Sequence, residues 1–284
     1  MHGGCRFTHS YSPGVSPFCA IISTARRPCL EPTINPKISA VEARWARFEG
    51  FTLLFDNPGQ CCRGTESGPL LDCRPEGDPA LALYAALARG LASFDLQAAM
   101  FRHGFCPTPG ASYHVTAWDG LNPALDAQLK PEVLQRARAC YAALPAGSDA
   151  ERGFLAELQP VIQGLNAQLP IRMKYAALRS TPGVGLVADL VPADHESARA
   201  FERLQAERMA AAQAAARRWG AAYSTALQPH ITLGYYANAA DTRPLDPELP
   251  AWNAGLARAC AGLELEFSSV SFYAFTDMAR FYRR

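Results

Sequence analysis

The chain lacks any stretch of eighteen consecutive apolar residues, so the sequence predicts no membrane-spanning helix. It also carries little net charge, because 27 basic and 26 acidic side chains leave +1 at neutral pH. So small a net charge does not favour binding to duplex nucleic acid or to an anionic membrane surface. A small or single-stranded anionic ligand is compatible with this charge.

The nine cysteines include no C-x-x-C pair, and Cys61 and Cys62 are adjacent. An odd and irregular set of thiols is typical of a reducing compartment, which predicts a cytoplasmic protein without a disulfide framework. No paired cysteine and histidine spacing predicts a zinc site, and we expect neither a metal nor another cofactor. The G-x-S-x-G, Walker and H-E-x-x-H motifs are absent as well.

The composition of the 284 residues, 49% hydrophobic and 19% charged, is that of an ordinary globular protein. Residues 1–44 differ from the rest: they are rich in proline and show no clear period, and up to residue 40 four basic side chains face one acid, Glu31. We interpret residues 1–44 as a disordered or irregular N-terminal extension, with an organelle transit peptide as the alternative. Residues 45–284 are the predicted folded domain.

Hydrophobic periodicity and turn residues predict alternating strands and helices in this domain. Expected helices begin at Asp78-Pro79 and cover 131–144, 148–166, 194–219 and 246–260, and expected strands cover 51–55, 96–102, 112–118, 170–179, 184–191, 229–236, 263–268 and 270–276. Ser148 and Glu151 form a capping box, and Gly220 is placed to end the long alanine-rich helix. Elements mixed without regular βαβ alternation favour an α+β fold with two antiparallel sheets flanked by helices.

Two short strings carry most of the chemical information in the chain: Tyr113-His114-Val115-Thr116 and Pro229-His230-Ile231-Thr232. Each places a histidine two residues before a threonine within an apolar run that predicts a strand. Because side chains alternate faces along a strand, His114 and Thr116 are expected on one face, as are His230 and Thr232. The motifs are 116 residues apart, one in each half, which suggests two lobes around a central cleft.

Paired histidines can act as acid and base near neutral pH. Splitting a phosphodiester needs a base that activates water and an acid that protonates the leaving ribose oxygen. The hydroxyls of Thr116 and Thr232 can donate hydrogen bonds to the non-bridging oxygens as negative charge builds up there. The alternative is that both histidines are ordinary residues of packed strands.

The two H-x-T strings, His114-Val115-Thr116 and His230-Ile231-Thr232, resemble the twin signature of the 2H phosphoesterase superfamily, which includes the LigT-like 2′-5′ RNA ligases and cyclic phosphodiesterases. The following Trp118-Asp119-Gly120 resembles one branch of the LigT-like proteins, whereas Ala117 replaces the aliphatic residue that is frequent there. The resemblance covers residues 45–284. It implies a bilobal LigT-like fold and a metal-independent site between the lobes, in which both histidines act on a 2′,3′-cyclic phosphate or a 2′-5′ linkage.

Other residues are candidate substrate-binding groups. If alternation continues, Trp118 lies beside the cleft and its indole can stack on a base, the alternative being a core position. Tyr236 is expected at the rim, Gly234 is expected to leave space, and Tyr113 and Tyr235 are expected to face away. Basic side chains that could hold the phosphate, or could equally be solvated surface charges, are Arg102, Arg172 and Lys174.

We therefore expect a cytoplasmic, monomeric phosphoesterase that acts on a nucleotide or an RNA terminus, with His114 and His230 as the acid and base. A module that binds such a ligand without turnover is the alternative from another class. RNA 2′-5′ ligation needs the same residues and is not separable from hydrolysis on the sequence.

Overall fold

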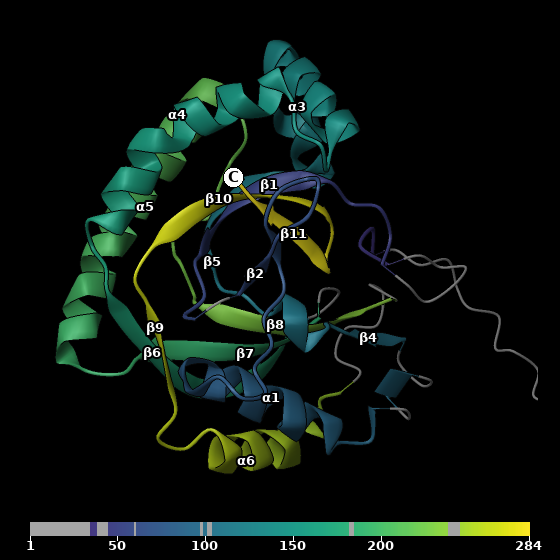
Figure 1. Cartoon of the computed structure of the whole chain (residues 1–284), viewed down its shortest axis with the longest axis vertical. Helices are drawn as coiled ribbons and strands as arrows, with labels where there is room; N and C mark the ends of the chain where they lie inside the picture. The colour runs from purple at the N-terminus through teal and green to yellow at the C-terminus, as the bar shows by residue number, and fades with distance from the viewer. Residues whose placement is uncertain are drawn as a thin grey trace, which may run out of the picture. The chain divides into compact units, whose positions relative to one another are not determined.

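Two antiparallel sheets form the scaffold of the protein (Figure 1). The computed structural model describes residues 35–38, 45–59, 61–96, 99–100, 104–181, 185–237 and 245–284, and the fold is that of the unit Pro32–Arg284. Helices flank the sheets, so the expected α+β class is confirmed.

The first sheet has six strands in the order β2-β3-β11-β10-β1-β5. Its strands are β1 (Gly50–Phe55), β2 (Cys62–Arg63), β3 (Leu70–Leu71), β5 (Thr116–Leu121), β10 (Val270–Asp277) and β11 (Arg280–Arg283). Strand β1 is fully buried between β10 and β5, in keeping with its continuous apolar sequence. The sheet therefore joins strands from both ends of the domain, and the two sheets do not correspond to the two successive halves that the spacing of the motifs suggested.

The second sheet has five strands in the order β4-β8-β7-β6-β9. Its strands are β4 (Phe105–Pro107), β6 (Ile171–Thr181), β7 (Gly185–Pro192), β8 (His230–Tyr236) and β9 (Glu264–Phe267). Strand β4 pairs only with the last residues of β8, so the first residues of β8 have a free side. That side faces the first sheet.

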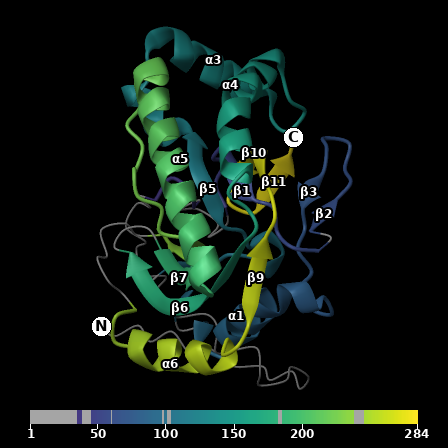
Figure 2. The ribbon, with the colours of Figure 1, turned by 90° about the vertical axis from the view of Figure 1, so that its left-hand side faces the viewer.

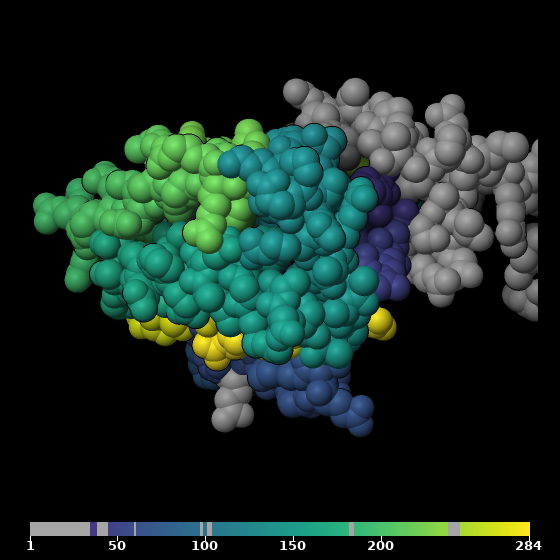
Figure 3. Space-filling model, turned by 90° about the horizontal axis from the view of Figure 1, so that it is seen from above, coloured from purple at the N-terminus to yellow at the C-terminus, as the bar shows by residue number. Residues whose placement is uncertain are grey.

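Five α-helices have described bounds: α1 (Ala82–Ala92), α3 (Pro131–Ala143), α4 (Asp149–Asn166), α5 (His195–Trp219) and α6 (Leu249–Ala259). Short 3-10 turns are η2 (Pro79–Leu81), η3 (Gly110–Ser112) and η4 (Pro123–Gln128). Figure 2 shows α4 and α5 side by side along one flank and α1 with α6 below the second sheet. In the space-filling view, the teal surface of α3 and α4 adjoins the green surface of α5 (Figure 3).

Local sequence chemistry explains the helix ends. Ser148 accepts a hydrogen bond from the backbone N–H of Glu151 at 3.1 Å, which confirms the predicted start of α4. Asp194 does the same for Ser197 at 2.8 Å at the start of α5. Gly220 ends α5 with φ of +94°, a conformation in which a Cβ is unfavourable.

Two strand predictions were wrong in their bounds or type. Leu96, Ala99 and Met100 of the expected strand 96–102 are helical. The first histidine strand, expected over 112–118, begins at Thr116, because η3 occupies Gly110–Ser112 and holds the chain in a turn just before the motif. Strands β2, β3, β4 and β11 are additional and have at most four residues each, too short for a clear period-two pattern.

Part of the predicted N-terminal extension is packed against the domain. Ile38 is buried and forms an antiparallel bridge with Trp45, and the side chain of Asn35 donates a hydrogen bond to the carbonyl of Tyr236 at 2.8 Å. Residues 1–34 and 39–44 of the predicted extension lie outside the described residues. No helix in the described ranges is long and apolar enough to cross a bilayer.

A close approach of backbones at Gly120 gives the first prediction. A Cβ at this position would lie 1.8 Å from the carbonyl oxygen of Phe51. Any residue larger than glycine would therefore force β5 away from β1. We expect Gly120→Ala to lower the free energy of unfolding by about 2–3 kcal/mol, measured by denaturant titration. Gly64→Ala is the matched control, because a Cβ there meets nothing within 4 Å. Equal stability of the two variants would contradict the packing at Gly120.

Candidate active site

The two histidine motifs meet where the edges of the two sheets come together. Val115 and Ile231, the middle residues of the motifs, form an antiparallel bridge that joins the first sheet to the second. In this register His114 lies opposite Thr232, and Thr116 lies opposite His230. The backbone N–H of Phe55 also donates to the carbonyl of Val115 at 3.0 Å, which holds the start of the motif against β1.

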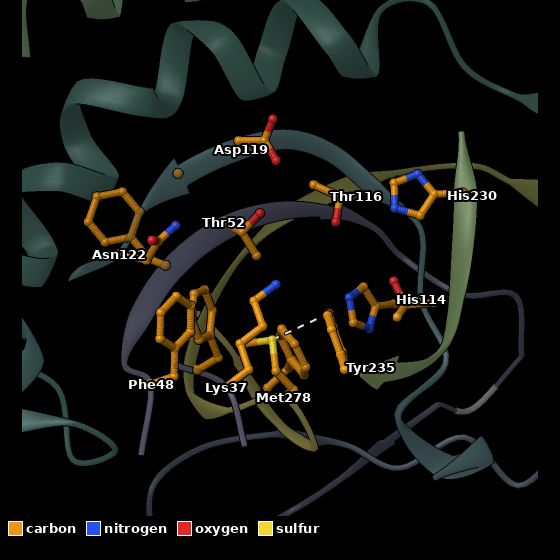
Figure 4. Close-up of a pocket in the computed structure, with 15 residues that line it drawn as sticks. Lys37, Phe48, Thr52, His114, Thr116, Asp119, Asn122, His230, Tyr235 and Met278 are labelled. Carbon is orange, nitrogen blue, oxygen red and sulfur yellow. Dashed lines mark hydrogen bonds between the residues drawn. The ribbon is translucent and has the colours of Figure 1, made fainter. Parts of the chain in front are cut away.

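All four motif side chains open into one cavity of about 180 Å³ (Figure 4). Aromatic and apolar side chains form much of its wall. The lining residues are Lys37, Phe48, Phe51, Thr52, His114, Thr116, Asp119, Gly120, Asn122, His230, Thr232, Tyr235, Phe275, Met278 and Phe281.

Both imidazoles are oriented by a hydrogen bond to the backbone carbonyl two residues earlier. Nδ1 of His114 donates to the carbonyl oxygen of Ser112 at 2.7 Å, and Nδ1 of His230 donates to the carbonyl oxygen of Gln228 at 2.8 Å. A carbonyl oxygen can only accept, so each Nδ1 carries the hydrogen. This sets the tautomer and leaves each Nε2 without a hydrogen in the neutral ring, available to accept a proton.

The environment of His114 favours its neutral form. Its ring packs against Phe281, with ring centroids 4.3 Å apart. Burial lowers the pKa of His114 to about 4, the positive charges of His230 and Lys37 act in the same direction, and the hydrogen bond to Ser112 opposes them. At neutral pH this imidazole is therefore a proton acceptor.

A β-bulge directly after Thr116 overturns one expectation. Thr116 lies opposite Leu54 and Trp118 opposite Leu53, so Ala117 is an extra residue that interrupts the alternation of faces. Trp118 is consequently fully buried and does not line the cavity. It packs on Tyr223 and Trp219, with ring centroids 4.7 and 5.9 Å apart, so its expected place beside the cleft was wrong.

The second motif contains the corresponding bulge. Thr232 lies opposite Val187 and Gly234 opposite Leu186, which makes Leu233 the extra residue. The bulge turns Tyr235 into the cavity and buries Tyr236, so the expected faces of these two tyrosines were reversed. The hydroxyl of Tyr236 shares a hydrogen bond with Ser180 at 2.8 Å instead of reaching the rim.

Gly234 does not leave space for a ligand. A Cβ there would lie 2.3 Å from the ring of Phe105, which fills the position. Its small size serves the pairing of β4 with β8. The expectation of free space at Gly234 was therefore wrong.

Two of the three predicted phosphate-binding cations, Arg172 and Lys174, do not line the cavity. Arg172 is paired with Asp194 and, at 3.2 Å, with Glu264. Lys174 donates to the carbonyl of Ala193 at 3.4 Å and lines a different cavity, beside α6. Their positions on β6 lie away from both motifs. Arg102 lies outside the described residues.

Lys37 is the cation that sequence reasoning missed. Its amine lies 4.5 Å from the ring centroid of Tyr235 and 5.7 Å from that of Phe48, at the wall of the cavity. A residue in a proline-rich segment before the first strand gives no periodic signal that would place it there.

A second missed residue, Arg208, supports the bulge of β5 from behind. It is 2% exposed on α5, and its Nε donates to the carbonyl of the bulged residue Ala117 at 3.1 Å. Its other nitrogens donate to the carbonyl of Ser224 at 2.6 Å and to the carboxylate of Asp119 at 3.1 Å. The sequence signal was an arginine within the buried stripe of α5, between Leu204 and Ala211.

No protein-family model and no curated protein sequence matches the chain. Among solved structures, the chain is similar to a conserved protein of unknown function from Agrobacterium tumefaciens. The identity is 19% and the TM-score 0.48, over 95% of this chain and 98% of that chain. Within the described ranges, no group of three or more His, Cys, Asp or Glu side chains is placed to hold a metal ion. Function is therefore inferred from the residues of this chain alone.

The contacts of Arg208 give the second prediction. Arg208→Met leaves the carbonyls of Ala117 and Ser224 without this donor, so we expect the free energy of unfolding to fall by about 2 kcal/mol. Denaturant titration measures the change. Arg218→Met is the control: this arginine is on the same helix, its side chain is 62% exposed, and loss of its ion pair with Glu157 is expected to cost less than about 0.5 kcal/mol. A loss at Arg208 no larger than at Arg218 would refute the supporting role.

Proposed function

We propose that the protein is a LigT-like 2H phosphoesterase that cleaves 2′,3′-cyclic or 2′-5′ phosphodiesters of RNA ends or small nucleotides. The observation that carries the proposal is the convergence of two imidazoles and two threonine hydroxyls in one cavity. The chemistry needs no metal, because one histidine can remove a proton while the other supplies one. The bilobal LigT-like fold is part of the same proposal.

In the proposed reaction His114 is the general base. Its Nε2 takes a proton from water as the water oxygen bonds to phosphorus. The bond from phosphorus to the ribose 2′ or 3′ oxygen breaks, and Nε2–H of protonated His230 gives its proton to that oxygen. Burial and the low pKa of His114 support this division of roles, since a neutral ring is required of the base.

The threonines have complementary positions in this scheme. Because each threonine lies opposite the histidine of the other motif, a phosphorus atom between the rings is within reach of both hydroxyls. Hydroxyl donors aimed at the non-bridging oxygens stabilise the charge that builds up in the transition state. Thr116 and Thr232 are therefore assigned to phosphate binding.

Substitution of each histidine tests the function directly. We expect wild-type protein to hydrolyse 2′,3′-cyclic nucleotides or 2′-5′ dinucleotides, and His114→Ala and His230→Ala each to lower kcat by at least about 100-fold, the usual contribution of a positioned acid or base. The exposed His195 at the start of α5 provides the control, His195→Ala, which should retain activity. Turnover that survives both cavity substitutions would refute the assignment. Tight nucleotide binding with no turnover by any of these proteins would favour the binding module.

The pH dependence of kcat/KM tests the role of His114. Protonated His114 cannot accept a proton, so activity should be retained well below pH 6 and should fall as the pH drops through about 4. The profile is measured with a cyclic nucleotide in buffers of constant ionic strength. An acidic limb centred near 6.5, the ordinary pKa of histidine, would contradict a desolvated base at this position.

A further inference from the structure

We propose that Lys37 is a third catalytic group of this site, whose ammonium binds the phosphate and stabilises the negative charge of its transition state. The inference rests on the proposed phosphoesterase function and goes beyond the twin motifs. It also assigns a catalytic role to a segment that precedes the first strand of the sheets.

The backbone around Lys37 is held in place. Its N–H donates to the side-chain oxygen of Asn35 at 3.1 Å, and its carbonyl accepts from the N–H of Ala46 at 2.9 Å. The next residue, Ile38, is 3% exposed and bridges to Trp45. A ligand that binds the ammonium therefore does not have to order this backbone as well.

The side chain is directed into the cavity by aromatic rings. Its amine lies over Tyr235 and near Phe48, within the range in which a cation is attracted to a ring face. Figure 4 shows this amine and both imidazoles in the same cavity, with Thr116 beside His230. The bulge of β8 is what turns Tyr235 toward Lys37, so the positions of the lysine and of the second motif are connected.

The charge of Lys37 is available to a ligand. Among the residues that the structure describes, no carboxylate lies within ion-pair distance of its amine. The carboxylate of Asp119, which also lines the cavity, pairs with Arg208. The influence of Lys37 on the pKa of His114 is consistent with a positive charge close to the reacting centre.

The reaction needs such a permanent charge. A phosphodiester carries one negative charge, and attack by water with loss of a proton to His114 produces a pentacoordinate phosphorus with a second. The threonine hydroxyls are neutral, and the charges of the histidines change as protons move. A lysine ammonium that takes no part in these proton transfers therefore offsets charge that is larger in the transition state than in the ground state, which is the condition for a gain in rate.

Steady-state kinetics on a 2′,3′-cyclic nucleotide test the inference. We expect Lys37→Met to lower kcat by about 100-fold or more, as for loss of one oxyanion donor, with a much smaller change in KM. Lys37→Arg should keep part of the activity. Lys174→Met, which changes a lysine outside the cavity in the same way, is the control. Thermal unfolding should be unchanged in all three variants.

Chemical rescue separates the charge from the shape of the side chain. In Lys37→Cys, 2-bromoethylamine alkylates the thiolate with loss of bromide and creates a side chain with an amine at the length of lysine. We expect this treatment to restore much of kcat in Lys37→Cys and not in Lys37→Met, which controls for alkylation of the other cysteines.

The acidic limb of the pH profile of kcat/KM is a further test, because loss of a purely structural residue would not shift it. Removal of the charge in Lys37→Met should raise the pKa of His114 and shift the limb to higher pH. Turnover that requires His114 but persists within about threefold in Lys37→Met would overturn this inference alone. A wild-type protein without turnover on any cyclic or 2′-5′ substrate would overturn the proposed function and this inference together.

Discussion

The site depends on one backbone contact, the antiparallel bridge between Val115 and Ile231. Ile231 belongs to β8 of the second sheet and Val115 directly precedes β5 of the first, so the bridge brings the histidine and threonine of both motifs together. Because the first part of β8 is not covered by β4, its edge is free to meet the chain that leads into β5. Without this contact each histidine would lie at the edge of its own sheet, and neither could act with the other.

The two motifs share local structure as well as the H-x-T sequence. In each, Nδ1 donates to the carbonyl two residues earlier, and a bulge follows the threonine. The carbonyls of the bulged residues accept hydrogen bonds from outside β1 and β7, the strands opposite them. Arg208 donates to the carbonyl of Ala117, and the N–H of Thr108 donates to the carbonyl of Leu233 at 2.9 Å. The bulges then bring Asp119 and Tyr235 into the cavity, where Asp119 pairs with Arg208 and Tyr235 lies against Lys37.

Much of the fold could be predicted from local chemistry, since caps at Ser148, Asp194 and Gly220 act within one turn of helix. The shared face of the histidine and the threonine within each motif was also predictable, because the two residues are only two positions apart. Trp118 and Tyr236 were misplaced for a physical reason: a bulge is decided by the register against β1 or β7, which alternation along one strand does not contain. Arg172 and Lys174 were misplaced because their surroundings depend on residues distant in sequence, and Lys37 was missed for the same reason.

The central claim is that both imidazoles act on a single phosphorus atom. A crystal structure of the protein with a nucleoside vanadate, which imitates the pentacoordinate transition state, tests it most directly. We predict vanadium in the cavity of about 180 Å³. Nε2 of His114 and Nε2 of His230 should each lie about 2.8 Å from an oxygen on opposite sides of the metal, the ordinary length of a charge-assisted hydrogen bond. Vanadate that contacts only one imidazole, or that binds away from both, would contradict the account.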